Sequence, residues 1–475
     1  MRGLKSLGVL VVVLGGLVAY IYFVESKRPA GGPDAVETKE KVFTVASDKI
    51  QELTVKASNG DRTVLKKSGT AWELVEPEKL AADEAEVSGL TSGLSSLEIQ
   101  RVVEEQAADL KGFGLDTPRI EVGFKAEGDK DLHTVRLGDK TPTGGDMYAM
   151  LAGQKRVFLV SGYLDSTFDR TTFSLREKSA LKFDRAKADS LEVVTADRTI
   201  KLAKAGEEWK LVGPVTARTD FGAVEAVVSR LQTSQMKAIV APQVKDPKEY
   251  GFDKPEAIAR VGAGSAMATL TIGKRTDDGT NYALDGARPM VFTVESGLLD
   301  DLKKPADDLR RKDIFEFRSY NATRLEVTRG AETLALEKYT AKTADGKGTE
   351  DKWRLLKPEA RELESAKVDT LLSRLTSLRA QSFTDPAAKE KTKTGLEAPV
   401  AVVQVAFDEG KKQDRVTFGK ADSDVYAGRP DEAGAAKLLS YDWDEIVKAI
   451  DELKQKPEPK KDAAADAKKD EKPKQ

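Results

Sequence analysis

Three tryptophans occupy the same place in a repeated motif, Trp-x-Leu-x-x-Pro, at residues 72–77, 209–214 and 353–358. A second proline follows each tryptophan after 46 residues, at Pro118, Pro255 and Pro399. A fixed spacing of this kind indicates one domain design written three times. Most of the prominent residues of the chain are therefore expected to serve the fold rather than a reaction.

Each repeat begins with short β-rich segments and continues into a helical pattern. In the first copy the segments 53–56 and 62–66 precede the Trp strand, and alternation places Trp72 and Leu74 on one face. Apolar residues then recur 15, 18 and 22 positions after each tryptophan, as at Val87, Leu90 and Leu94. These steps of three and four predict a helix with one buried stripe, after a meander of three antiparallel strands. The acidic residues Asp83, Asp220 and Glu364 lie where this helix would begin and suit its dipole.

A glycine four residues before each second proline marks the entry to further strands, at Gly114, Gly251 and Gly395. Glycine supplies backbone freedom and proline cannot donate to a ladder, so the pair predicts a turn at a strand start. The segments 120–126, 134–137 and 157–160 are the expected strands of the first copy. Each unit is therefore predicted to be an α+β domain of ordinary size.

Composition excludes several kinds of function. The chain has 475 residues and a formal net charge of −2, which argues against a nucleic-acid binder. It contains no cysteine, so disulfides, thiolate metal sites and cysteine nucleophiles are excluded. His133 is the one histidine, which removes histidine-based triads within one chain and most zinc sites.

The N-terminal segment predicts a membrane anchor. Residues 6–24 carry no charge, and a helix of 19 residues would reach roughly 28 Å, about one hydrocarbon core. Tyr20, Tyr22 and Phe23 end the run, where interfacial aromatic residues are expected. A cleaved signal peptide is the alternative, although its apolar region is usually shorter and ends in small residues. The expected location is the inner (cytoplasmic) membrane, single-pass, with the bulk of the chain periplasmic or extracytoplasmic.

The predicted organisation is an N-terminal single transmembrane helix followed by three tandem homologous α+β domains, each with antiparallel strands packed on a helix. Beyond the last domain, lysine, alanine and proline dominate a tail that cannot build a core. The expected segments are a cytoplasmic N-terminus (1–6), the transmembrane anchor (7–24), a linker (25–41), repeat domains 42–181, 182–315 and 316–453, and a disordered tail (454–475).

A search for chemistry along the chain names no catalytic, cofactor-binding or metal-binding residue. Residues 277–281 resemble a calcium loop only faintly, because Arg288 stands where the twelfth-position acid belongs, and 422–424 are similar. Residues 346–349 lack the upstream glycine of a phosphate-binding loop. His133 has no counterpart in the other copies, and Trp443 is expected to close the core of the last domain, with sugar stacking or partner contact as the alternatives.

Several features of the chain carry a family resemblance: the anchor, the Trp-x-Leu-x-x-Pro strand, the Gly-Leu-Asp-x-Pro turn, the Leu-Arg-x-Lys connector, and the tyrosine that recurs at Tyr148, Tyr282 and Tyr426. Together they resemble the bacterial domain-of-unknown-function family numbered 4340. The resemblance covers about residues 3–450. The third copy departs from it, because Thr394 replaces the aromatic residue of Phe113 and Tyr250 and residues 339–352 are inserted. The resemblance implies a membrane-tethered envelope protein without assigned catalytic residues. Relatives encoded beside ABC transporter components of the gliding-motility type imply an accessory role.

We therefore expect a non-catalytic, membrane-anchored extracytoplasmic scaffold or accessory subunit of an envelope complex, with no cofactor. Its expected partners are the membrane, through residues 7–24, and envelope proteins such as an ABC transporter permease and ATPase, without nucleic acid. Repeated domains with a common core and divergent loops favour binding over catalysis. The alternatives are a cell-wall glycan-binding module, with Tyr148, Tyr282 and Tyr426 marking the loops, and an envelope hydrolase.

Overall fold

The structure is a computed structural model that describes residues 39–455 except 344, 346, 385 and 387–391. The chain divides into two compact units at Lys178–Ser179, and each is described by itself. The predicted anchor, most of the predicted linker and nearly all of the predicted tail lie outside the described residues. Within the described part of the chain, no helix is both long and apolar enough to cross a bilayer.

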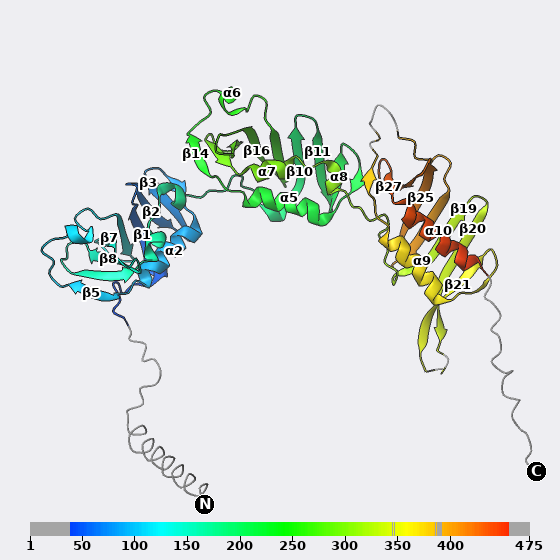
Figure 1. Cartoon of the computed structure of the whole chain (residues 1–475), viewed down its shortest axis with the longest axis horizontal. Helices are drawn as coiled ribbons and strands as arrows, with labels where there is room; N and C mark the ends of the chain where they lie inside the picture. The colour runs from blue at the N-terminus through cyan, green and yellow to red at the C-terminus, as the bar shows by residue number, and fades with distance from the viewer. Residues whose placement is uncertain (1–38, 344, 346, 385, 387–391, 456–475) are drawn as a thin grey trace, which may run out of the picture. The chain divides into compact units, whose positions relative to one another are not determined.

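The described part of the chain contains three nine-stranded sheets with the same strand order, and every pairing in them is antiparallel (Figure 1). In each sheet the first four strands form one meander and four later strands form another. The first strand of each meander joins the two, as β1 pairs with β6 in the first sheet. The remaining strand, which follows the main helix in the sequence, lies at the far edge.

The first unit contains one sheet and its helices. Its strands are β1 (Ile50–Lys56), β2 (Arg62–Ser68), β3 (Ala71–Glu76), β4 (Leu80–Ala81), β5 (Arg101–Glu104), β6 (Ile120–Ala126), β7 (His133–Lys140), β8 (Asp146–Leu151) and β9 (Val157–Ser161). Its helices are α2 (Glu84–Ser95), α3 (Leu164–Phe168), α4 (Thr172–Leu175) and the short 3₁₀ helices η2 (Ser47–Lys49) and η3 (Lys111–Phe113).

The second unit contains the other two sheets. The second sheet consists of β10 (Ala188–Thr195), β11 (Thr199–Ala205), β12 (Glu208–Gly213), β13 (Ala217–Arg218), β14 (Ala238–Ala241), β15 (Ala257–Ala263), β16 (Ala266–Arg275), β17 (Asn281–Asp285) and β18 (Val291–Val294). Its helices are η4 (Arg185–Lys187), α5 (Phe221–Thr233), α6 (Pro247–Tyr250), α7 (Ser296–Leu302) and α8 (Ala306–Leu309).

The third sheet has the same plan with a longer second hairpin. It consists of β19 (Ala322–Arg329), β20 (Glu332–Lys342), β21 (Thr349–Lys357), β22 (Arg361–Glu362), β23 (Ser382–Phe383), β24 (Ala401–Phe407), β25 (Lys412–Ala421), β26 (Asp424–Gly428) and β27 (Ala436–Leu438), with helices α9 (Ser365–Ser377) and α10 (Ser440–Lys454). The predicted insertion 339–352 lies in the β20–β21 hairpin, which extends beyond the neighbouring strands (Figure 1).

The repeated tryptophans belong to the cores, and the predicted three-strand meander is confirmed. Trp72, Trp209 and Trp353 are 7%, 3% and 3% exposed, and the leucine two residues later is buried in each case. The proline that ends each motif follows a cis peptide bond in all three copies. The motif is therefore a strand whose inward face carries the tryptophan and the leucine.

The predicted helix is confirmed in every copy as α2, α5 and α9. Asp83 and Asp220 are N-caps whose carboxylates accept backbone N–H groups of the first turn, whereas Glu364 makes no such bond. The Leu-Arg-x-Lys connector lies beside the start of this helix in the first two copies. Its Leu175 and Leu309 carbonyls accept the N–H groups of Asp83 and Asp220.

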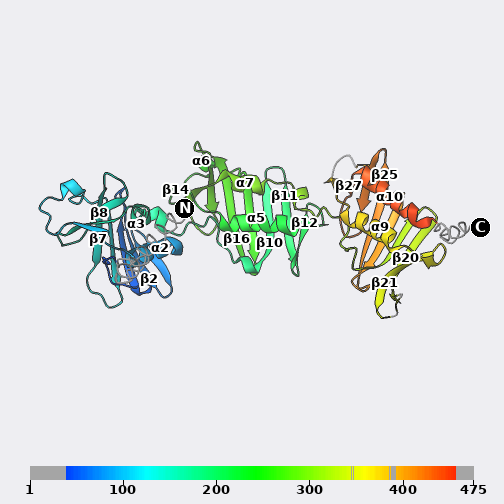
Figure 2. The same cartoon turned by 60° about the horizontal axis from the view of Figure 1, so that its bottom comes forward.

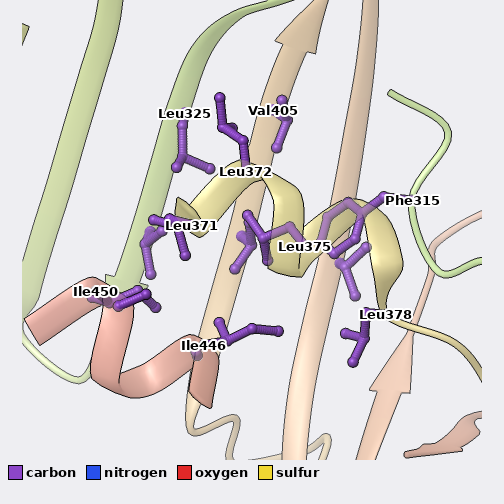
Figure 3. Close-up of a cluster of buried hydrophobic side chains, with 14 of the residues drawn as sticks. Phe315, Leu325, Leu371, Leu372, Leu375, Leu378, Val405, Ile446 and Ile450 are labelled. Atoms are coloured by element: carbon purple, nitrogen blue, oxygen red, sulfur yellow. The ribbon is translucent and has the colours of Figure 1, made fainter. Parts of the chain in front are cut away.

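The buried stripe of each helix packs on one face of its sheet. Figure 2 shows α5 across the second sheet with α7 on the same side. In the third domain, Leu371, Leu372 and Leu375 of α9 belong to one buried cluster. Leu372 lies beside Leu325 and Val405 of the strands, and α10 adds Ile446 and Ile450 on the other side (Figure 3). Each domain is α+β with a larger share of strand than of helix, because one helix layer covers nine strands.

The glycines of the predicted turn permit a close backbone approach. Gly251 has a φ of 76°, a left-handed conformation that favours glycine. Beside it, a Cβ added to Gly273 would lie 2.0 Å from the carbonyl oxygen of Tyr250. Gly138 and Gly419 meet a carbonyl oxygen in the same way at 2.1 and 2.2 Å. The recurrent glycines therefore lock each turn against the end of a strand.

Candidate binding groove of the second domain

The three domains can be compared position by position at the end of one hairpin, because strand register fixes the counterparts. In the first domain Phe124 lies opposite His133, with ring centroids 5.3 Å apart. Phe43, from the segment that enters the domain, packs edge-on against Phe124 at 5.0 Å. Both phenylalanines are buried, so aromatic side chains fill this end of the core.

The third domain fills the same place with other groups. Phe315 and Phe407 are 1% and 4% exposed, and Phe407 ends β24 opposite Lys412. Asp414, which lies opposite Val405, is buried and accepts the N–H groups of Glu316 at 2.6 Å and Phe317 at 3.1 Å.

Arg429 completes this closure of the third domain. Its Nη1 lies 2.7 Å from Oδ1 of Asp414. Burial opposes the charge on Arg429, but its hydrogen bonds to Asp431 and Asp414 outweigh that effect and raise its pKa.

The second domain has a groove at this place. Its cross-strand pairs are Val261 with Ala268 and Ala263 with Ala266, whereas Leu181, at the position of Phe43 and Phe315, is itself buried. The two cross-strand pairs line a groove of about 780 Å³ between the β15–β16 hairpin, the β17–β18 loop and residues 182–187. Phe183, the counterpart of the buried Phe317, is half-buried and lines the groove. Met267, next to the turn of the hairpin, is 61% exposed, and its pairing with Gly262 places its side chain on the other face of the sheet from Val261 and Ala263.

The charged side chains around the groove are engaged with one another and with the backbone. Arg288 Nε lies 2.7 Å from Oδ2 of the buried Asp285, and Arg288 Nη2 donates to the carbonyl oxygens of Ser179 and Ala180 at 2.7 and 2.9 Å. Lys187 lies 3.0 Å from Asp184. Because these charges are compensated, the groove offers mainly apolar contact, which favours an apolar, uncharged group.

The edge of the second sheet also differs from the edges of its sister sheets. Strand β14 reads Ala-Ile-Val-Ala, and Ile239 and Val240 are 37% and 44% exposed. The corresponding β5 is bounded by the exposed Arg101 and Glu104, and β23 has two residues. Charges and short length protect a sheet edge from pairing with another chain, and β14 has neither a charge nor the two-residue length of β23.

A second pocket of about 290 Å³ lies near the start of α5. Its lining is mostly charged and includes Arg218, Asp313 and Glu316. Phe221, the first residue of α5, lines it and is 62% exposed. In the first domain Glu84 holds that helix position and accepts the backbone N–H of Trp72 at 2.8 Å.

Buried charges join the second and third sheets within the second compact unit. Glu432 pairs with Arg218 and lies 3.3 Å from Arg310. The Arg310 guanidinium is 3.6 Å from the centre of the Phe383 ring. Burial lowers the pKa of Arg310, against the opposing effect of Glu432. The arginines are bound by a carboxylate and by carbonyl groups, so this cluster is explained as a structural joint.

The residues singled out in the sequence do not converge on one site. Tyr148 and Tyr282 lie in strands, half-buried, against Phe113 and Tyr250. Tyr426, whose aromatic partner is replaced by a threonine, is 6% exposed. The three tyrosines thus lie in strands rather than at loop tips.

The remaining candidates have local structural roles. His133 is exposed at the start of β7, with Nε2 3.2 Å from Asp129. Trp443 lies in the core of the third domain, stacked 4.4 Å from Phe418, as expected. The calcium-like segment forms a turn in which Asp278 accepts the Thr280 N–H at 3.2 Å.

The other carboxylate and glycine candidates give no metal or phosphate site. Asp422, at a φ of 53°, lies in the turn before β26, and Asp424 pairs with Lys437 at 2.6 Å. Of residues 346–349, Gly346 lies outside the described residues. In the part of the chain that the structure describes, no three histidine or acidic residues are grouped so that they could hold a metal ion.

Sequence reasoning missed the groove, although the signal was present. Alignment of the hairpins by register sets Ala263 against Phe407, and Ala268 against His133 and Asp414. A repeat in which small residues replace large ones at neighbouring core positions indicates a cavity. The substitution becomes visible only when the hairpin lengths, which differ between copies, are known.

The family comparison agrees with the repeat structure. The family model described as Domain of unknown function (DUF4340) matches residues 72–210 and 209–399. Each match begins at a motif tryptophan, and the first ends in β12 of the second sheet, so the family unit is offset from the structural domain. No curated protein and no solved structure matches the chain. The two matches cover well over half of its length, and the chain belongs to the DUF4340 family of domains of unknown function.

Proposed function

We propose that this protein is a non-catalytic, membrane-anchored extracytoplasmic scaffold or accessory subunit that holds a partner protein through its second domain. The observation that carries the proposal is the groove of about 780 Å³ at the end of the second domain, lined by Val261 and Ala263 where the sister domains have Phe124 and Phe407. A pocket of this size is in the range that proteins use for binding.

Electrostatics supports binding rather than hydrolysis. A glycosidase acid needs a raised pKa, which comes from burial beside apolar groups or like charges. Every described carboxyl group with a clear shift has a lowered pKa, as Glu225 does through the indole N–H of Trp209 and through Arg185. These carboxylates are held ionised by donors and cations, which suits structural ion pairs.

The wider setting of the proposal rests on the sequence. The apolar segment 7–24 would tether the chain to the inner membrane, and the three domains would lie outside the cytoplasm. The family resemblance makes an envelope complex the natural partner, with an ABC transporter permease and ATPase as the first candidates. The uncharged edge of β14 offers a second surface for such a partner.

A cell-wall glycan is the alternative ligand, and the 290 Å³ pocket favours it. An exposed aromatic ring beside carboxylates and a guanidinium is the arrangement that stacks on and hydrogen-bonds a sugar. Phe221, Asp313 and Arg218 provide these groups. The pocket is small and its arginine is engaged with Glu432, so we rank this function second.

The proposal is tested by affinity purification of the full-length protein from its native membrane after cross-linking, with mass spectrometry of the products. Recovery of envelope proteins in a fixed ratio supports the scaffold. Recovery of wall fragments without proteins supports the glycan alternative. The Phe221→Ala variant separates the two functions, because it should lose wall fragments and retain protein partners.

A further inference from the structure

The groove of the second domain has a more specific occupant, whose identity is indicated by the sister domains. We propose that it accepts an aromatic side chain, such as phenylalanine, from an extended segment of a partner protein. This inference rests on the proposed scaffold function and names the chemistry of its contact.

The sister domains show which group fits this fold at this place. The first domain places Phe43 and Phe124 there, and the third places Phe315 and Phe407. The second domain keeps the same strands and the same register, but Val261 takes the position of Phe124 and Ala263 that of Phe407, and both line the groove. A ring supplied by another protein would restore the packing that the sisters achieve within their own chain.

The size of the groove allows such a ring. Its volume of about 780 Å³ greatly exceeds the roughly 150 Å³ of an apolar cavity that binds benzene. The space therefore accommodates an aromatic side chain together with the backbone that carries it. Ala266 is exposed, pairs with Ala263 and shares its face of the sheet, so the end of the groove is open to solvent there.

The lining favours an aromatic ring over an alkyl chain. The Arg288 guanidinium lines the groove and already lies 5.7 Å from the centre of the Phe292 ring. A guanidinium is attracted to the face of an aromatic ring and gains nothing comparable from an alkane. A lipid acyl chain would bury apolar area alone, so we favour the protein segment.

Methyl NMR tests the proposal on the full-length protein in lipid nanodiscs. The chain has six methionines, so the spectrum of protein labelled with ¹³C at the methionine methyl groups is simple. An Ala266→Met variant adds one reporter resonance on the face that carries Val261 and Ala263. The probes are three capped pentapeptides that differ at the central residue, which is phenylalanine, alanine or a straight eight-carbon alkyl amino acid. A ring bound in the groove shifts the added methyl resonance upfield.

We expect an upfield shift with the phenylalanine peptide, and binding at least about tenfold weaker with the alanine peptide. The shift should vanish in Ala263→Phe and in Val261→Phe, which fill the groove as the sister domains do, and persist in the surface control Ala366→Phe. Two filling variants guard against one of them misfolding, and an unchanged resonance of the buried Met236 reports an intact second domain.

Several results would overturn the aromatic anchor. These are no shift with the phenylalanine peptide, equal binding of the alkyl peptide, or an unchanged response in both filling variants. Failure here is distinguishable from failure of the scaffold. If partners are recovered from the membrane while the peptides give no response, the aromatic anchor is wrong and the scaffold proposal stands.

Discussion

Filling the groove is the perturbation that examines its existence most simply. Ala263 is 9% exposed and ends β15 at the register position that Phe407 occupies in the third domain, where the ring is 4% exposed. In most cores an Ala→Phe substitution is overpacking and costs about 1–3 kcal/mol. Here an open groove of about 780 Å³ lies beside the new side chain. The Ala263→Phe variant should therefore gain stability instead of losing it.

The expected gain follows from the apolar area that the ring would remove from water. A phenylalanine buries about 150–250 Å² when enclosed, so a ring in an open groove adds roughly 100 Å² beyond alanine. At about 25 cal/mol per Å² the transfer contributes about 2.5 kcal/mol, and the ordering of the side chain returns part of it. We expect a net stabilisation of about 1–2 kcal/mol.

Hydrogen exchange with mass spectrometry is the suitable assay, because it reads the second domain separately from its neighbours. Peptides covering β15 and β16 should exchange more slowly in Ala263→Phe, by about five- to thirtyfold. The surface control Ala366→Phe should change stability by less than about 0.5 kcal/mol. Faster exchange of these peptides in Ala263→Phe would mean that the groove is not open to a ring, and the reasoning would fail.

Four further predictions concern the third domain, the joint, the turn and the titration of a structural carboxylate. Phe407→Ala should destabilise the third domain by about 3 kcal/mol, measured by hydrogen exchange, and a loss under 1 kcal/mol would refute its role in the core. Glu432→Gln leaves two buried arginines short of a countercharge and should cost about 3 kcal/mol in urea unfolding, whereas the exposed Glu409→Gln should cost little. Gly273→Ala places a methyl group 2.0 Å from the Tyr250 oxygen and should cost about 2 kcal/mol or more, while the open Gly89→Ala should be neutral or stabilising. The hydrogen bond from the indole of Trp209 lowers the pKa of Glu225. Its contribution to stability is therefore present above the unfolded pKa of about 4.3 and is lost as pH falls through the lower folded value. The difference in stability between wild type and Glu225→Gln should shrink toward pH 3, and a constant difference would contradict the assignment.

Much of the fold could be predicted because three copies repeat the same constraints. The Trp strand, the meander and the helix follow from periodicities that each copy confirms independently. The Gly–Pro turn follows from backbone chemistry that other residues cannot supply. Agreement between copies removed the ambiguity that a single short strand would carry.

The rest of the fold could not be read because the signal was short or depended on tertiary contacts. Strands β4, β13 and β22 have two residues each, too few to show alternation. The edge strand β14 reads as an apolar run, and its exposure is set by its place at the end of the sheet. Trp443 was correctly expected in a core, but the packing of α10 beside α9 was not predicted.

The candidate site could not be predicted because a groove is a difference in side-chain volume between structurally matched positions. Val261 and Ala268 are ordinary strand residues by themselves. They acquire meaning when the register shows Phe124 and His133 at the same places in the first domain. The hairpin loop is longer in the third copy, so a fixed sequence offset pairs the wrong residues there.

Site-specific photo-crosslinking in living cells tests the central claim most directly. A photoreactive amino acid is placed at Ala266, on the groove, and separately at Lys412, which has the same register position in the closed third domain. We predict that position 266 forms one discrete adduct with an envelope protein, mapped to a segment that contains an aromatic residue, and that position 412 does not. Equal cross-linking from both positions, or none from position 266, would contradict the account.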